Sequence, residues 1–113
     1  MKTLLLCSLL FISLTAAGAP RVLHVTRLDD NVRAPEPGMF RWAMMQRGER
    51  KVEFKVAGDI MLKDRVQIRN GSLTVDGSTA PAQGVCIRGG SLEFENAPNV
   101  TLRYLRIRLG DET

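Results

Sequence analysis

The sequence has 113 residues, of which 44% are hydrophobic and 25% are charged. This length suffices for one small domain, and the composition is that of a globular protein rather than a disordered chain. Sixteen Lys and Arg residues against 12 Asp and Glu residues give a net charge of +4. This mild basic excess suits a polyanionic partner such as an acidic polysaccharide, but it suits many other partners equally well, so charge alone does not decide the function. We expect no nucleic-acid partner.

Residues 1–19 are predicted to be a signal peptide. Lys2 supplies a positive charge, residues 4–14 are almost wholly apolar, and small residues follow at positions 15–19. This order is typical of a secretory signal, with cleavage expected after a residue between Ala17 and Ala19. A membrane anchor is the alternative, but about a dozen apolar residues are too few for a bilayer, which needs about 20. We therefore expect no membrane span and a secreted protein, extracellular or periplasmic.

Residues 20–113 are expected to form one domain. Cys7 is removed with the signal, so Cys86 remains alone and no disulfide can form within the mature chain. A secreted domain of this size without disulfides must be held together by its hydrophobic core or by a larger body.

The N-terminal third of this domain predicts a strand, a loop and a helix. Arg21–Leu28 alternates apolar and polar residues as a strand does, and residues 29–38 contain the turn formers and prolines of a loop. Met39–Arg47 is the one predicted helix, with Gly48 expected at its C′ position. Because this helix is apolar on nearly all sides, it must be covered on more than one side, as a short helix that closes the end of a larger structure would be.

Beyond Lys51 the apolar spacing changes to two, and no further helix is predicted. Short apolar runs separated by Gly, Asn, Asp and Pro turns predict many short strands. The alternation changes phase between Tyr104 and Leu105, which predicts a corner or bulge there. Such strands could form a sandwich or barrel of hairpins, or a solenoid.

An internal repeat favours the solenoid. The segment 66–78 aligns with the segment 85–97, so that Val66 corresponds to Val85, and almost half of the aligned positions are identical. A fixed period of about 20 residues, with strands and turns only, is typical of one coil of a β-helix. A chance similarity within a protein of hairpins is the alternative.

The expected architecture is all-β: the first coils of a right-handed parallel β-helix with a short N-terminal capping helix. Such a solenoid needs both ends covered, because unpaired strand edges promote aggregation. The helix at 39–47 can cover one end, whereas no comparable segment follows the last strand before Thr113. We therefore expect the chain to be the N-terminal part of a longer reading frame, truncated at its C-terminus.

Several segments of the sequence resemble, in order and spacing, the N-terminal part of the pectate lyases. These segments are Phe40–Ala43, Val52–Ile60, Ile68–Asn70, Thr74–Pro81, Gly84–Arg88 and Leu102–Asp111. The similarity extends from about Val22 to Asp111. One departure is Asp76-Gly-Ser78, where this branch of the family more often has Ala-Gly-Gln, and it is confined to a turn.

The resemblance implies a monomeric parallel β-helix that acts on an acidic polysaccharide, polygalacturonate. In these enzymes an arginine removes the proton at C5 of the uronate, and the glycosidic oxygen at C4 departs. Calcium held by clustered aspartates offsets the charge that develops beside the uronate carboxylate. The family's calcium aspartates, its Trp-Ile-Asp-His stretch and its Arg-x-Pro-x-x-Arg segment lie beyond Thr113. The sequence therefore assigns no catalytic residue and no metal ligand, and we expect this chain to be inactive by itself.

Four residues are candidates for lining a substrate groove: Arg106, Arg108, Asp111 and Glu112. Arginine suits a polyanion, but a row of arginines on an outer sheet face is more often a solvated surface. For the two acidic residues, a solvated turn is the alternative. Two other functions stay open: a small non-catalytic secreted β-solenoid that binds acidic polysaccharide or has a structural role, and a β-helix enzyme for another acidic glycan.

Overall fold

The computed structural model of the protein describes residues 20–110, so the predicted signal peptide lies outside the described residues, as do Asp111 and Glu112. The described part forms β1 (Arg21–Val25), α2 (Phe40–Met44), β2 (Arg50–Phe54), β3 (Gly58–Leu62), β4 (Val66–Ile68), β5 (Leu73–Asp76), the 3-10 turn η1 (Gly77–Thr79), β6 (Val85–Gly89), β7 (Leu92–Phe94), β8 (Val100–Arg103) and β9 (Arg106–Leu109).

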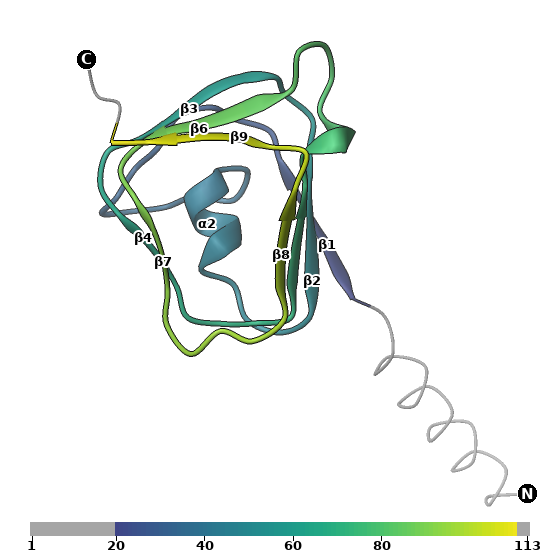
Figure 1. Ribbon diagram of the computed structural model, residues 1–113, viewed down its shortest axis with the longest axis vertical. Helices are drawn as coiled ribbons and strands as arrows, with labels where there is room; N and C mark the ends of the chain where they lie inside the picture. Colours follow the sequence, from purple (N-terminus) through teal and green to yellow (C-terminus); the bar gives the residue numbers. More distant parts are fainter. Residues whose placement is uncertain (1–19, 111–113) are drawn as a thin grey trace, which may run out of the picture.

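The strands form three parallel sheets, which are the sides of a solenoid (Figure 1). The strand orders are β1-β2-β5-β8, β3-β6-β9 and β4-β7, and all the pairings are parallel. From β2 onwards each strand belongs to a different sheet from the one before it. The chain therefore turns a corner after each strand and comes back to the first sheet one layer further along. The predicted parallel β-solenoid is confirmed.

The internal repeat, however, does not correspond to one coil. Val66 pairs in the next layer with Leu92 rather than with Val85, which lies in a different sheet. The two similar segments are consecutive strand–corner–strand units, β4–β5 and β6–β7. The interpretation of the repeat as one coil is therefore wrong. The segments are alike because every corner of the solenoid needs inward apolar residues beside turn formers.

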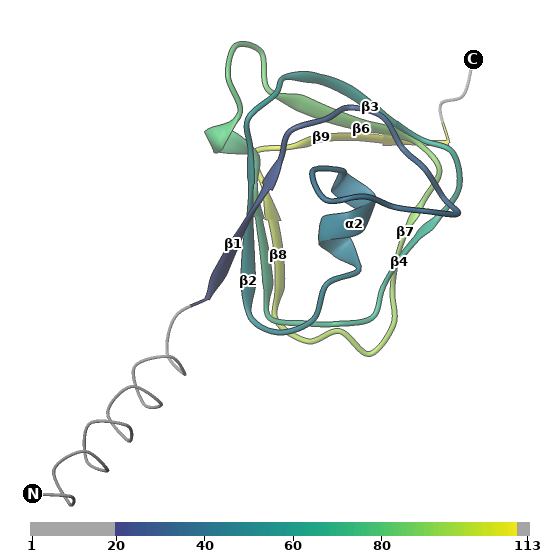
Figure 2. The same cartoon turned by 180° about the vertical axis from the view of Figure 1, so that it is seen from behind.

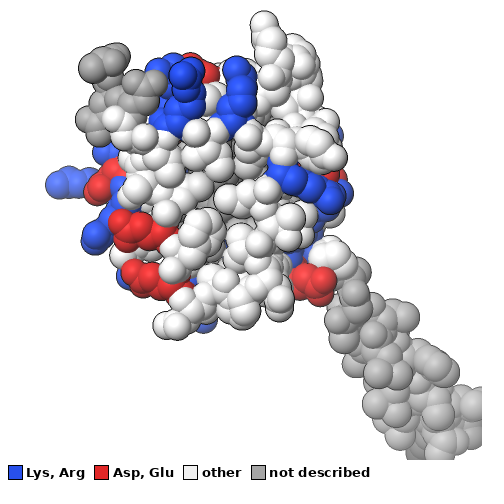
Figure 3. Space-filling model, in the orientation of Figure 1, with Lys and Arg blue, Asp and Glu red and all other residues white. Residues whose placement is uncertain are grey.

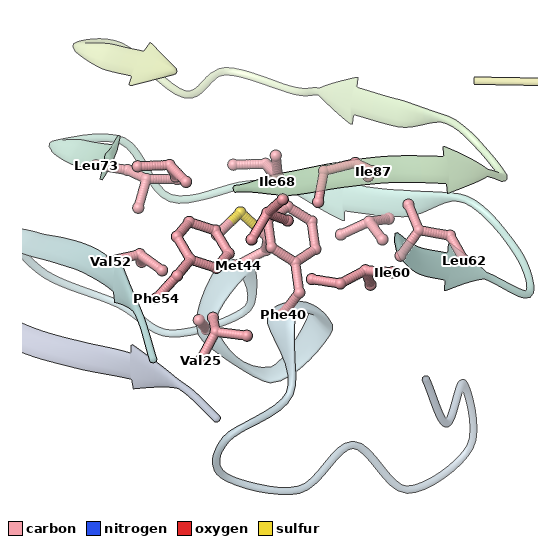
Figure 4. Close-up of a cluster of buried hydrophobic side chains, with 14 residues drawn as sticks. Val25, Phe40, Met44, Val52, Phe54, Ile60, Leu62, Ile68, Leu73 and Ile87 are labelled. Atoms are coloured by element: carbon pink, nitrogen blue, oxygen red, sulfur yellow. The ribbon is translucent and has the colours of Figure 1, made fainter. Parts of the chain in front are cut away.

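The hydrophobic core is a column of side chains stacked inside the coils (Figure 4). In one sheet Val52 lies over Val75, which lies over Leu102 in the next layer. The burial of this column changes along the stack. Ile87 is fully buried, whereas Ile107, its partner in the last layer, is 41% exposed. The core is thus covered at the N-terminal end of the described residues and open at the C-terminal end.

Helix α2 provides the cover at the N-terminal end. Viewed along the stack, it lies inside the outline of the coils, and Figure 2 shows it from the N-terminal side (Figures 1 and 2). Phe40 and Met44 point into the core beside Phe54 (Figure 4). The helix is shorter than the predicted Met39–Arg47. Gly48 has the left-handed φ of 84° expected of a helix-ending glycine, but it lies in the turn after the helix rather than at its C′ position.

Arg50 explains how the helix ends and how it is held. Its side chain is 1% exposed and has no carboxylate partner among residues 20–110. Its nitrogen atoms donate to five backbone carbonyls, those of Ala43, Met44, Gly48, Asn70 and Gly71, at 3.0 to 3.3 Å. Two of these carbonyls end the helix, and two belong to a corner of the next coil. A guanidinium has five N–H donors, so the number of acceptors matches the number of donors.

The charge of Arg50 is therefore buried but fully hydrogen-bonded. Burial lowers the pKa of Arg50 from its ordinary value, and the positive charge of Arg21 lowers it further. An arginine nevertheless stays protonated in proteins. The partial negative charge at the C-terminal end of a helix favours a cation in this place.

A second buried arginine fixes the N-terminal side of the cap. Arg41 makes a two-pronged ion pair with Asp30, Nε to Oδ1 at 2.7 Å and Nη2 to Oδ2 at 2.9 Å. It also donates to the carbonyls of Asp64 and Arg65, and Asp30 accepts the N–H of Lys63. Burial by itself raises the pKa of Asp30, but the hydrogen bonds from Arg41 and Lys63 outweigh it, so its pKa is lowered.

The corner between β8 and β9 carries backbone strain. Tyr104 has a φ of 58° and is 73% exposed, in agreement with the predicted change of phase at this position. A Cβ on Gly77, one layer below, would collide with the Tyr104 carbonyl, so the two corners are in close contact. A left-handed conformation costs an L-residue about 1–2 kcal/mol, and asparagine tolerates it better than tyrosine does.

We predict that Arg50→Met lowers the free energy of unfolding by at least about 2 kcal/mol, because buried carbonyls lose their donors. Urea denaturation followed by circular dichroism measures the change. Arg21→Met is the matched control. Arg21 pairs with Arg50 in the register of β1 and β2, is exposed, and has one backbone partner, the Arg47 carbonyl. Equal effects of the two substitutions would contradict the role given to Arg50.

Tyr104→Asn is expected to raise the free energy of unfolding by about 1 kcal/mol, because it relieves the left-handed strain while removing an exposed ring. The unfolding midpoint in urea reports the gain. Tyr104→Phe, which keeps a bulky ring at the same φ, should leave the midpoint unchanged. A destabilised Asn variant would show that the tyrosine ring contributes packing.

Stability should decline in acid. A carboxyl whose folded pKa is lowered stabilises the fold above its unfolded pKa of about 3.9, and this contribution is lost as the pH falls through the folded pKa. Asp30 and Asp76 are both in this class. We expect the free energy of unfolding to fall steadily below about pH 5. Asp76→Asn should flatten part of that decline, and a wild-type stability that stays constant down to about pH 3 would refute the assignment.

Candidate functional site

The two predicted groove arginines lie on β9, the last strand of its sheet. Arg106 pairs in register with Cys86, and Arg108 pairs with Arg88 on β6. Figure 3 shows Lys and Arg side chains along the side of the molecule on which β9 runs. Arg106 has one long contact, 3.5 Å to the Gln83 carbonyl. Within residues 20–110, Arg108 makes no hydrogen bond or ion pair. Both side chains are exposed and can approach an anion.

The structure brings Arg106 and Arg108 together on one sheet but does not test their predicted role. The same sheet carries an acidic residue, Asp59, which accepts from Arg88 at 3.1 Å. The other two predicted groove residues, Asp111 and Glu112, lie outside the described residues. The predicted groove therefore stays a prediction.

A second group of arginines lies around a cleft between α2 and β4. This arginine cleft is lined by Arg41, Arg47, Arg65, Arg69, Asp64 and Met45, among others. The sequence does not predict this cleft, because its residues come from three segments that are separated along the chain. The buried Arg41 forms part of its wall, whereas the other three arginines are largely exposed. The sequence does contain one indication of the arginine cleft, because Arg65 and Arg69 flank the short β4 strand.

The turn at Asp76, where the sequence departs from the pectate lyase pattern, has a structural role. Asp76 accepts from the N–H of Ser78 at 3.0 Å and from its hydroxyl at 2.6 Å, and it pairs with Arg103 at 3.2 Å. The hydrogen bonds from Ser78 lower the pKa of Asp76, and Arg103 lowers it further. This carboxylate caps η1 and holds a strand of the next coil, so both of its oxygen atoms already have partners.

The described residues do not supply the calcium site that the resemblance implies. Within residues 20–110, no three His, Cys, Asp or Glu side chains come close enough to hold a metal ion together. The most buried carboxylates, Asp30 and Asp76, are bound to arginines instead.

His24, the single histidine, lies on β1 at 3.5 Å from Glu53, as a surface residue. Cys86 is a buried free thiol. This part of the chain also contains no helix long and apolar enough to cross a membrane.

Comparison with known proteins gives consistent matches. The chain is 38% identical over 80 residues to a protein of Aspergillus flavus named probable pectate lyase C, which covers 71% of this chain and 19% of that protein. Proteins of the same name from Aspergillus fumigatus and Emericella nidulans are 39% and 35% identical over 90 and 89 residues, which are 80% and 79% of this chain. The chain spans about one fifth of the length of these relatives. No protein-family model matches the sequence.

Three observations agree: the sequence identity of 35% to 39% with these proteins, the parallel solenoid, and the ordered motifs of the sequence. The chain is therefore a homologue of the pectate lyases that corresponds to about one fifth of their length.

Proposed function

We propose that the chain is the capped end of a secreted pectate lyase-like protein whose whole form cleaves polygalacturonate by calcium-dependent β-elimination. The observation that carries the proposal is the homology to proteins named pectate lyase over as much as 80% of the chain. In this proposal residues 20–110 close the solenoid and position the coils that follow. The catalytic arginine and the calcium ligands belong to the rest of the longer protein.

The role of the described residues in this proposal is physical rather than chemical. A solenoid nucleates and propagates from coil to coil, and an end without a cap exposes its core. Arg41 and Arg50 attach α2 to the two corners that flank β4, so the cap is held by charge-assisted hydrogen bonds as well as by apolar contact. The later coils would then stack on β7, β8 and β9 in a fixed register.

A non-catalytic module that binds acidic polysaccharide is the second candidate. Its supporting observation is the pair Arg106 and Arg108, which are exposed on β9 with little compensation by the described acidic residues. In this proposal the protein is a monomer that attaches to a polyuronate through these arginines. Binding should then weaken as salt is added, because exposed charges are screened.

We predict no lyase activity from the 113-residue chain itself. Incubation with polygalacturonate and calcium should give no rise in the ultraviolet absorbance of unsaturated uronate, because residues 20–110 bring no acidic cluster together. A full-length pectate lyase in the same assay is the positive control. A rise that a chelator abolishes would show that this chain carries a complete active site.

The gene sequence beyond the codon for Thr113 separates the two candidates. A continuing frame with clustered aspartates, Trp-Ile-Asp-His and Arg-x-Pro-x-x-Arg supports the enzyme. A stop codon, together with a soluble and folded protein that ends at Thr113, supports the binding module instead.

A further inference from the structure

We propose that the arginine cleft is a binding site for the carboxylate groups of a uronate oligosaccharide, separate from the arginines of β9. The choice of ligand rests on the proposed function, whereas the site itself rests on the geometry and charges of the cleft. Among the cleft residues, Arg41 holds the cap with its side chain, and Asp64, Arg65 and Asn70 do so with their backbone carbonyls. The side chains of Arg47 and Arg65 make no such contact within residues 20–110.

The cleft is held in shape by buried groups. Arg41 is 5% exposed and joins Asp30 to the carbonyls of Asp64 and Arg65, so the wall on the α2 side is attached to the β3–β4 turn. The wall beyond is β4, whose Val66 is fully buried. The free volume is about 410 Å³, within the range of roughly 300–1,000 Å³ that is common for small-ligand sites.

The charges of the cleft are unevenly compensated. Asp30 neutralises Arg41, and Glu95 pairs with Arg69 at 3.2 Å. By contrast, the side chains of Arg47 and Arg65 make no hydrogen bond or ion pair within residues 20–110, although both line the same cleft.

Asp64 is the one acidic residue in the lining formed by the described residues, and its Oδ1 accepts the backbone N–H of Arg65 at 2.7 Å. Two guanidinium groups therefore remain for an external anion. A guanidinium binds a carboxylate by two parallel hydrogen bonds.

Exposed apolar groups in the same cleft favour a sugar acid over a simple anion. Met45 and Val32 are 52% and 40% exposed and lie on the lining. A uronate residue has a carboxylate at one edge and C–H groups on its ring faces, so it can meet the arginines and the apolar side chains together. A phosphate or sulfate ion would leave the apolar part uncovered.

The test is the binding of a galacturonate oligomer to the whole chain by isothermal titration calorimetry at low salt. Two double variants remove equal charge: Arg47→Ser with Arg65→Ser in the cleft, and Arg106→Ser with Arg108→Ser on β9. The cleft variant should bind at least about tenfold more weakly, because it loses charge-assisted hydrogen bonds. The methyl-esterified oligomer, which lacks the carboxylates, should not bind. All four side chains are exposed, so the unfolding midpoints should stay equal, and circular dichroism checks this.

Each outcome bears on a different proposal. If the β9 variant alone loses affinity, or both variants lose it equally, the cleft is not the site, and the inference is overturned. If the esterified oligomer binds as well as the acid, carboxylate recognition is overturned. If the unaltered chain does not bind the acidic oligomer, the binding-module proposal fails together with the cleft, whereas the pectate lyase proposal, which depends on the gene beyond Thr113, is unaffected.

Discussion

The buried guanidinium of Arg50 is the interaction on which the rest of the structure depends. It is surrounded by backbone carbonyls and has no counter-charge in the part of the chain that the structure describes, so its position is set by the ends of three chain segments at once. Those segments are the last turn of α2, the turn that follows it and a corner of the next coil. Because a buried charge without these acceptors would be very costly, the helix can end only where its carbonyls reach the arginine. The cap and the second coil are thereby joined in one geometry.

The cap that this guanidinium holds covers only one end of the solenoid. At the capped end the core side chains, such as Val25 and Phe54, are fully buried. At the other end Phe94 and Ile107 are partly exposed, and the last strand of each sheet is paired on one side only within the described residues. Figure 3 looks onto that end and shows uncharged atoms at its centre with charged side chains around the rim. Such a surface is suited to the addition of another coil, whose apolar residues would continue the column.

The arginines of the protein fall into two classes that the sequence does not distinguish. Arg41 and Arg50 are buried and hold the cap by hydrogen bonds to carbonyls and to Asp30. Arg47, Arg65 and Arg108 are exposed, and their side chains have no partner within residues 20–110. The basic excess of the composition therefore includes arginines that hold the fold together and arginines that lie on the surface. Only the exposed class is available to an acidic polysaccharide. It includes the arginines on β9 and around the arginine cleft, as well as Arg21, Arg33 and Arg103 elsewhere on the surface.

The sequence by itself determined the class of fold, because alternation with a period of two and turn residues between short strands are local properties of the chain. It also carried the resemblance to the pectate lyases, because the order of the motifs along the chain can be read without any knowledge of contacts. The tertiary structure alone decided the register. The likeness of Val66 to Val85 reflects what each corner requires, whereas the pairing of Val66 with Leu92 is set by corner lengths and core packing. It also decided which arginines are buried, since burial depends on pairs such as Asp30 and Arg41, or Arg50 and Asn70, that only folding brings together.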